Sequence, residues 1–495
     1  MTEIQPSTDI QTLNLESKFA SLPSTFFTRL IPTPLKEPYL IAISNPLAKS
    51  IGLNPDLIDQ DFCDVFTGNK LITNSQPLAA VYSGHQFGVW AGQLGDGRAI
   101  LLGDVANSNS IHRLEIQLKG SGMTPYSRMG DGRAVLRSSI REFLCSEAME
   151  GLGIPTSRAL CITGSDQYVM REEPETTAVV TRLAPSFIRF GSFEHWYYNN
   201  RPDELRILAD FVINNYFPEL LASTNQYQSL LAEVTKRTAE LMAHWQSVGF
   251  MHGVMNTDNM SILGLTLDYG PFGFMESFDP LHICNHTDQQ GRYSYQMQPT
   301  IGQWNCHAIG QALLPLIGSV ENTKEALNGY QRYFEEKYDQ LMHRKLGLHQ
   351  NIEGDKELIE NFFLIMQENA ADFTLTFRQL SHVLRNNDSQ DEPIRDLFTN
   401  RNSIDAWLIT YRERLCQEQI DDSLRHQAML AVNPKYILRN YLAQIAIAKA
   451  QDKDFSEINK LLQILQNPFD EQSEYESYAA LPPNWASKLE VSCSS

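Results

Sequence analysis

The 495-residue sequence has few cysteines and no long apolar run, and both absences narrow the class of protein. Its seven cysteines are scattered without a CxxC pair, which excludes a typical structural zinc site and a disulfide framework. No stretch reaches the roughly 18–20 apolar residues that cross a bilayer, so we expect no membrane span. The first 28 residues carry Glu3, Asp9 and Glu16 against one base, Lys18, unlike a signal or transit peptide. We therefore expect a cytoplasmic protein.

Positive charge is also scarce in this chain. Lysine and arginine total 40 against 59 aspartates and glutamates, which gives a formal net charge of −19. Such an excess repels nucleic acid and anionic membranes at long range, so we expect neither as a partner. Any anionic ligand must therefore be held by a local pocket of cations.

Apolar side chains, in contrast, make up 42% of the residues and can fill more than one core. Because a domain usually holds roughly 100–200 residues, we expect a chain of 495 to fold as several units. The residue pattern changes from extended and polar to β-like, then helical, and finally acidic and aromatic. We predict an N-terminal wrapping extension, a mainly β lobe, a mainly α lobe and a C-terminal tail, at 1–78, 79–190, 191–465 and 466–495.

Local periodicity supports this division. Alternating or β-branched runs bounded by turn residues predict strands at 79–82, 99–102, 114–118, 168–170 and 178–181. Apolar residues spaced for one helix face predict helices within 133–151, 205–217 and 230–248, and helical spacing dominates 303–465.

Two segments of the β lobe carry residue types that bind phosphates. The segment 92–98 reads GQLGDGR, and its glycines would let backbone amides approach a phosphate, although a plain hairpin turn is the simpler interpretation. Lys119 closes an alternating run, and Glu142 lies within the following helix. A strand lysine held by a helix glutamate is the arrangement that positions nucleotide phosphates in protein kinases.

A third segment supplies oxygen ligands and lacks one expected group. His252, Asn259 and Asp268 match the kinase motifs H-R-D-x-x-x-x-N and D-F-G, and Asn and Asp oxygens suit magnesium on a polyphosphate. Where a kinase has its catalytic Asp, this chain has Val254, which cannot accept a proton. Asp258 is the nearest carboxylate able to take that role, and a loop-capping Asp is the alternative.

The order of these parts along the chain is that of a protein kinase. We therefore predict an α+β protein with a protein-kinase-like bilobal fold, a mainly β N-lobe and a mainly α C-lobe, and N- and C-terminal extensions. Basic residues support a nucleotide cleft, since 113–141 holds six bases and two acids. Arg182 and Arg189 follow where the lobes would join, and two fixed guanidinium groups suit a triphosphate. Solvated surface arginines are the alternative.

Longer segments of the sequence closely resemble the selenoprotein O (YdiU) family, protein adenylyltransferases with a pseudokinase fold. The matching segments are Gly84-His-Gln-Phe-Gly88, 92–99, 117–128, 130–139, 252–260, 268–274, 303–305 and 433–436. The resemblance implies that ATP binds in reverse relative to kinases, with its α-phosphorus facing the acceptor. AMP would then pass to a Ser, Thr or Tyr hydroxyl of a protein, and magnesium pyrophosphate would leave.

Carried over by position, the resemblance implies a role for each site residue. Asp258 would accept the proton, and Asn259 and Asp268 would hold Mg²⁺, with Mn²⁺ as the alternative ion. Glu142 would orient Lys119. Asp268 would also contact ATP. The other ATP-binding residues would be Gly95, Gly97, Arg98, Lys119, Asp131, Gly132, Arg182 and Arg189. We expect a monomer whose partners are ATP and protein substrates.

Two other functions stay open. One is a conventional kinase that uses Asp258 as its base, and the other is an inactive nucleotide-binding scaffold, which Val254 would explain. The resemblance also points to Cys493, which lies where animal members of the family carry selenocysteine. Cys284 lies in the region of a kinase activation loop, and a reversible Cys284–Cys493 disulfide for redox control is our hypothesis. Two unrelated thiols are the alternative.

Overall fold

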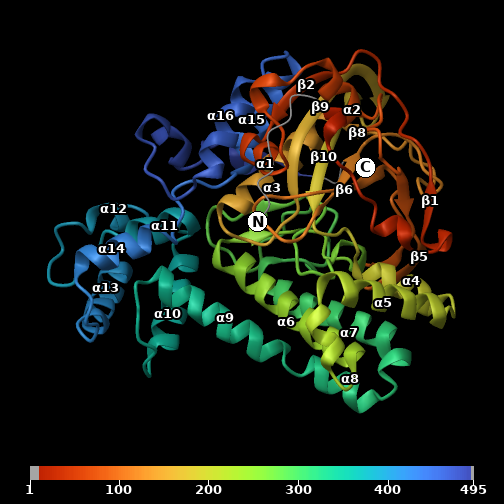
Figure 1. The fold of residues 1–495 in the computed structure, drawn as a ribbon. Coiled ribbons are helices and arrows are strands. Elements are labelled where there is room, and N and C mark those ends of the chain that lie inside the picture. Colours follow the sequence, from red (N-terminus) through yellow and green to blue (C-terminus); the bar gives the residue numbers. More distant parts are fainter. Residues whose placement is uncertain (1–9, 492–495) are drawn as a thin grey trace.

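A twisted antiparallel sheet occupies one half of the computed structural model, which describes residues 10–491 (Figure 1). Its strands lie in the order β1-β3-β6-β7-β10-β9-β2, and β8 pairs with β10. Their bounds are β1 Phe27–Arg29, β2 Tyr39–Ile43, β3 Leu78–Ala80, β6 Ala99–Val105, β7 Leu114–Lys119, β8 Ala134–Val135, β9 Arg158–Met170 and β10 Pro174–Ala184. The five strands predicted from the sequence correspond to β3, β6, β7, β9 and β10, of which the last two are much longer than predicted.

Helices cover both faces of this sheet, which is why β6 and β7 are buried at every residue. On one face, Phe66 of α2 (Gln60–Thr67) shares a core with Ile116 and Leu118 of β7. On the other, Phe143 of α3 (Leu136–Gly151) shares a core with Val180 of β10. The N-terminal segment, with α1 (Asn45–Ser50), α2 and two edge strands, therefore completes the sheet.

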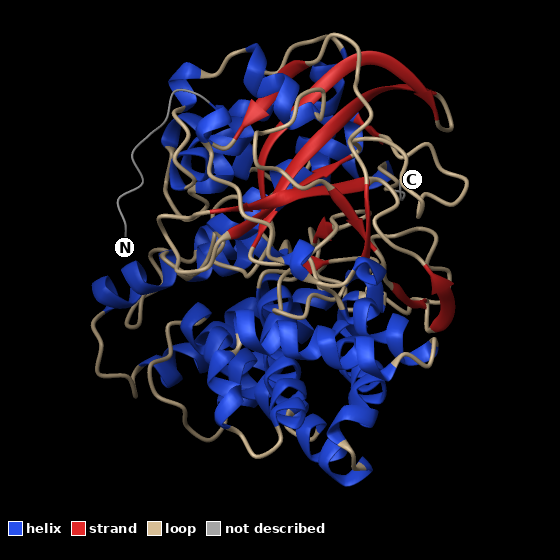
Figure 2. Ribbon diagram, turned by 45° about the vertical axis from the view of Figure 1, so that its right-hand side comes forward, coloured by secondary structure: helices blue, strands red, loops and turns tan. Residues whose placement is uncertain are grey.

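The other half of the molecule is helical (Figure 2). Its helices are α4 Phe190–Tyr198, α5 Pro202–Tyr216, α6 Gln226–Ser247, α7 Gln298–Ile317, α8 Val320–Leu327, α9 Tyr330–Lys345, α10 Asp355–Glu368, α11 Phe373–Leu380, α12 Glu392–Arg395, α13 Arg401–Leu415 and α14 Asp422–Leu430. The last two helices, α15 (Asn440–Gln451) and α16 (Ser456–Gln466), return to pack against α3 beside the sheet (Figure 1).

Two short strand pairs lie between the sheet and the helices. The pair β11 (Phe250–Met251) and β12 (Gly273–Phe274) closes the loops that carry residues 252–272. The pair β4 (Ser83–Gln86) and β5 (Val89–Gln93) forms a separate hairpin next to α4. The protein is thus a mixed α/β structure with a sheet region and a helical C-terminal part, compatible with a bilobal arrangement. A kinase-like fold and the four predicted domain boundaries stay predictions.

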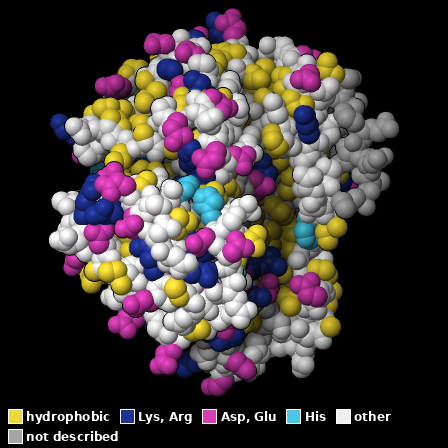
Figure 3. Space-filling model, turned by 90° about the vertical axis from the view of Figure 1, so that its left-hand side faces the viewer, with side chains coloured by type: hydrophobic (Ala, Val, Ile, Leu, Met, Phe, Trp, Pro, Cys, Tyr) yellow, Lys and Arg dark blue, Asp and Glu magenta, His cyan; other side chains and the backbone are white. Residues whose placement is uncertain are grey.

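Within residues 10–491, no helix combines the length and the apolar character needed to cross a membrane. On the face shown in Figure 3, acidic and basic side chains lie interspersed. The expectations of a cytoplasmic monomer that avoids nucleic acid stay untested.

Candidate active site

Lys119, at the end of β7, meets Glu142 of α3 and the side chain of Asp268. Its Nζ lies 2.6 Å from Oε2 of Glu142 and 3.4 Å from Oδ1 of Asp268. Lys119 is only 8% exposed, and burial lowers the pKa of its ammonium, while the two carboxylates favour the charged form. The strand lysine and helix glutamate that the sequence singled out are therefore in contact.

Two arginines converge on the same aspartate from β10 and the start of α4. Arg182 lies 3.0 Å from Oε1 of Glu142 and pairs with Oδ1 of Asp268, while Arg189 pairs with Oδ2. Burial alone would raise the pKa of Asp268, but Arg189, Arg182 and Lys119 hold it well below its usual range. Each arginine is 2% exposed, so neither is a solvated surface residue.

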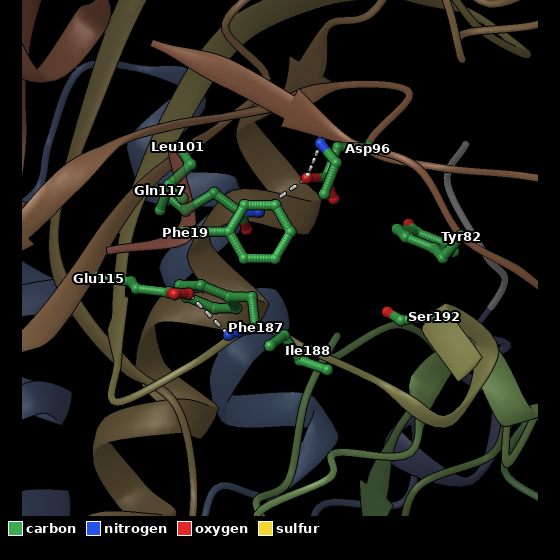
Figure 4. A pocket seen from close by; sticks show the side chains of 10 residues that line it. Phe19, Tyr82, Asp96, Leu101, Glu115, Gln117, Phe187, Ile188 and Ser192 are labelled. Atoms are coloured by element: carbon green, nitrogen blue, oxygen red, sulfur yellow. Dashed lines mark hydrogen bonds between the residues drawn. The ribbon is translucent and has the colours of Figure 1, made fainter. Parts of the chain in front are cut away.

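The two arginines also stack on aromatic rings beside a cavity. The Cζ of Arg189 lies 4.7 Å from the ring centroid of Tyr82, and that of Arg182 lies 5.2 Å from Phe187. Both rings line the cavity in Figure 4, together with buried Asp96 and Glu115. Burial raises the pKa of Asp96 to about 6 and that of Glu115 well above its usual range. An acidic cavity thus adjoins the cationic cluster.

Sequence reasoning missed the cavity, although strand alternation contained a signal for it. Glu115, Gln117 and Lys119 alternate along β7 and so lie on one face of the strand. Gln117 accepts a hydrogen bond from Arg182 and donates to Asp96 at 3.4 Å. The polar residues of this strand therefore all serve the same region.

Hydrogen bonds hold the loop that carries Asn259 next to Asp268. The Nε2 of His252 donates to the carbonyl oxygen of Leu267 at 2.8 Å, which ties the two loops together. The side-chain Nδ2 of Asn259 donates to the carbonyl oxygen of Val254 at 2.9 Å. The remaining oxygen of Asn259 and the carboxylate of Asp268 are hard ligands of the kind Mg²⁺ prefers, so their chemistry fits that ion.

Asp258 lies in the short helix Thr257–Asn259 and is 9% exposed. Its Oδ2 accepts a hydrogen bond from Nε2 of Gln86 at 3.3 Å, and its backbone carbonyl accepts one from Arg189 at 2.6 Å. Burial raises the pKa of Asp258 to about 6, while Arg189 and Gln86 oppose this rise. The predicted proton acceptor is thus adjacent to the cluster around Asp268.

The glycine loop packs closely against the loop that follows β7. A Cβ on Gly95 would lie 2.6 Å from the Tyr126 ring, and one on Gly97 would lie 2.9 Å from the Tyr126 carbonyl oxygen. Gly132 has a φ of +71°, and a Cβ there would meet the backbone of Gly122. Packing of the two loops therefore accounts for these glycines, and phosphate contact by their amides stays a prediction.

Asp131 has its ion pair away from Asp268, whereas burial, helped by the charge of Arg98, lowers the pKa of Lys119. Asp131 pairs with Arg171 at 2.8 Å, and hydrogen bonds from Arg171 lower its pKa. Arg98 is partly buried at the start of β6, where its carbonyl oxygen accepts from the amide of Gly120 at 2.7 Å. The structure therefore puts these two predicted ATP contacts around the same loop as Gly132.

Most of the bases between 113 and 141 have partners elsewhere, which corrects our interpretation of that cluster as the phosphate pocket. Arg113 pairs with Glu16, Arg137 pairs with Glu175, and Arg133 and Arg141 donate to backbone carbonyls. Lys119 joins Arg182 and Arg189 instead, and these three side chains form the cationic cluster.

Cys284 lies between the loop that carries Gly253 and the core of the helical half. A Cβ on Gly253 would lie 2.8 Å from its sulfur, and Cys284 also packs against the helical core. Two residues further, Nδ1 of His286 lies 3.2 Å from the carbonyl oxygen of Val491. Cys493 is outside the described residues, so the proposed disulfide stays a hypothesis that this contact supports.

Comparison with known proteins gives one consistent result. A family model described as "Protein adenylyltransferase SelO" matches residues 9–466. A protein nucleotidyltransferase YdiU from Herminiimonas arsenicoxydans is 62% identical over 484 residues, covering 97% of both chains. The corresponding protein of Dechloromonas aromatica is 55% identical over 487 residues, again with 97% of both chains covered. That of Burkholderia pseudomallei is 55% identical over 498 residues, covering 97% of this chain and 95% of its own.

Proposed function

The chain belongs to the SelO family of protein adenylyltransferases, and from this premise we propose that it transfers AMP from ATP to Ser, Thr or Tyr hydroxyls of proteins. Family membership makes the chain a nucleotidyltransferase; the acceptor and the orientation of ATP are our proposal. One observation carries it: three buried cations converge on Asp268, and one of them also contacts Asp258. The proposed phosphate site and the proposed proton acceptor are therefore neighbours.

The depth of the cations supports the reversed orientation of ATP. Arg182 and Arg189 are 2% exposed, whereas Asp131, near the predicted glycine contacts, is 41% exposed at its side chain. The inner end of the cleft therefore suits the β- and γ-phosphates, and the adenosine extends toward the outer loops. This arrangement brings the α-phosphorus, not the γ-phosphorus, toward the acceptor.

The reaction follows from this arrangement. Asp258 takes the proton of the acceptor hydroxyl, and the hydroxyl oxygen forms a bond to the α-phosphorus. The bond from that phosphorus to the bridging oxygen breaks, and pyrophosphate leaves with the electron pair. Lys119, Arg182 and Arg189 stabilise the charge on the phosphates, and Glu142 holds Lys119 and Arg182 in place.

Asn259 and Asp268 would hold Mg²⁺, which supplies further charge neutralisation on the phosphates. Both carboxylate oxygens of Asp268 are paired with arginines in this structure. We expect the ATP phosphates to replace Asp268 as partners of Arg182 and Arg189. The carboxylate then becomes available as a ligand.

Labelled ATP separates this function from its two alternatives. The protein is incubated with ATP carrying label at either the α- or the γ-phosphate, and label on protein is measured. Label from the α-phosphate alone supports adenylylation. Label from the γ-phosphate alone indicates a kinase that uses Asp258, and no label from either indicates a scaffold.

A further inference from the structure

The β4–β5 hairpin packs directly on the loop that carries Asp258. A Cβ on Gly84 would lie 3.0 Å from Oγ1 of Thr257 and 3.1 Å from Cβ of Asp258, so glycine permits this close approach. The amide of His85 donates to Oγ1 of Thr257 at 2.7 Å, and the amide of Phe87 donates to Oδ1 of Asn256 at 3.1 Å. Gly84, His85 and Phe87, the hairpin positions on both sides of Gln86, are thus held against the loop.

Other contacts fix the hairpin in one conformation. Phe87 and Gly88 have φ values of 51° and 80°, which form a tight two-residue turn between paired Gln86 and Val89. The buried carboxylate of Glu194 lies 2.6 Å from Nδ1 of His85 and accepts a hydrogen bond from Thr257. The backbone of Gln86 therefore has little freedom relative to the loop.

The side chain of Gln86 contacts one oxygen of Asp258 and leaves the other without a partner. Its Nε2 donates to Oδ2 at 3.3 Å. Among the described residues, Oδ1 of Asp258 is buried and has no hydrogen-bond partner. Burying a carboxylate oxygen without a hydrogen-bond donor costs free energy. Oδ1 of Asp258 is therefore suited to accept a hydrogen bond.

We propose that Gln86 is a positioning residue that holds Oδ2 of Asp258 and thereby presents Oδ1 to the proton of the acceptor hydroxyl. This inference rests on the proposed function, in which Asp258 is the proton acceptor. The proton moves from the hydroxyl to Oδ1, while the hydroxyl oxygen bonds to the α-phosphorus and pyrophosphate leaves. Gln86 donates the same hydrogen bond throughout and exchanges no proton.

The test is Gln86→Met, which keeps the side-chain length and removes the donor. We expect kcat for transfer of α-labelled AMP to fall roughly 10- to 100-fold, while KM for ATP changes less than about twofold. Gln427→Met, at an exposed position of α14 far from the proposed site in sequence, is the matched control and should keep wild-type values. Unchanged kcat in Gln86→Met, or equal losses in both variants, would overturn the proposal.

A double-mutant cycle with Asp258→Asn distinguishes positioning from a general structural role. The residual rate of Asp258→Asn is measured by single-turnover incorporation of α-label, with and without Gln86→Met. If Gln86 acts through Asp258, the second substitution lowers this rate no further. A further loss as large as that in the wild type would refute the positioning role. A wild-type rate in Asp258→Asn alone would instead contradict the proton-acceptor role of Asp258.

Discussion

The cationic cluster of Lys119, Arg182 and Arg189, called the cleft below, and the helical half both bury positive charges. The two regions compensate these charges differently. In the cleft, Lys119, Arg182 and Arg189 all lie within ion-pair distance of a carboxylate. Lys345, at the end of α9, is 4% exposed, and its Nζ lies 4.3 Å from the ring centroid of Phe377. Within residues 10–491, Lys345 has no ion pair with a carboxylate, and burial lowers its pKa to about 7.

In our proposal, this difference separates an anion site from a core position that buries a charge. The proposal is that ATP phosphates replace the carboxylate partners of the three cations, so that their buried charge serves binding. Among residues 10–491, the charge of Lys345 faces the ring of Phe377 and no carboxylate, and such a contact is weaker than an ion pair at that depth. The predictions below test this contrast, beginning with the largest effect.

Removing Asp268 should have the largest effect. Asp268→Ala leaves Lys119 and Arg182 with one shared carboxylate, Glu142, takes away the carboxylate that pairs with Arg189, and removes a proposed metal ligand. We expect transfer of α-label to fall below detection and the free energy of unfolding to fall by about 3–5 kcal/mol. Denaturant unfolding and label incorporation measure the two effects. Asp452→Ala, at an exposed position after α15, is the control, and retained transfer in Asp268→Ala would rule out the proposed metal site.

Arg189→Lys should have the next largest effect, because lysine keeps the charge and loses the planar fork. We expect KM for ATP to rise roughly tenfold, since Arg189 contacts both Asp268 and the Asp258 backbone. Steady-state kinetics with varied ATP measures this. Arg206→Lys, at an exposed position of α5, should leave KM unchanged. Equal KM values in both variants would show that Arg189 is not a phosphate ligand.

Lys345→Met should stabilise the protein, in contrast to both cleft variants. We expect a gain of about 1–3 kcal/mol at pH 7, because methionine fills a similar volume without a buried charge. The pKa of Lys345 in the folded protein, about 7, lies below the ordinary lysine value of 10.5, so the unfolded chain binds more protons between these two pH values. The contribution of Lys345 to the free energy of unfolding of the wild type therefore rises with pH between about 7 and 10.5, because Lys345 loses its buried charge. The gain from Lys345→Met should be larger at pH 6 than at pH 9, as measured by denaturant unfolding, and a pH-independent gain would contradict this account.

The smallest effect concerns the boundary between the two regions. Oxidation should join Cys284 to Cys493 and change the mobility of the protein on a non-reducing gel, because His286 already contacts Val491. Cys493→Ser should remove the change, whereas Cys416→Ser, at an exposed cysteine of the helical half, should keep it. Identical mobility of oxidised wild type and Cys493→Ser would exclude the disulfide.

Local patterns in the sequence predicted the parts of the site that depend on one element or one loop. Alternation located β7 with Lys119 at its end, and helical spacing located Glu142 in α3. The spacing from His252 to Asn259 identified the loop of the predicted metal ligand. These features depend on residues close in sequence, where periodicity and turn chemistry act directly.

Only the tertiary structure decided which charges face each other. Arg182 and Arg189 reach Asp268 across 86 and 79 residues, and Gln86 reaches Asp258 across 172. Arg113 and Arg137, which the sequence grouped with the phosphate pocket, pair with Glu16 and Glu175 instead. Charge composition is a property of a segment, but an ion pair forms where the packing of sheet and helices removes two side chains from water together, and no local pattern encodes that meeting.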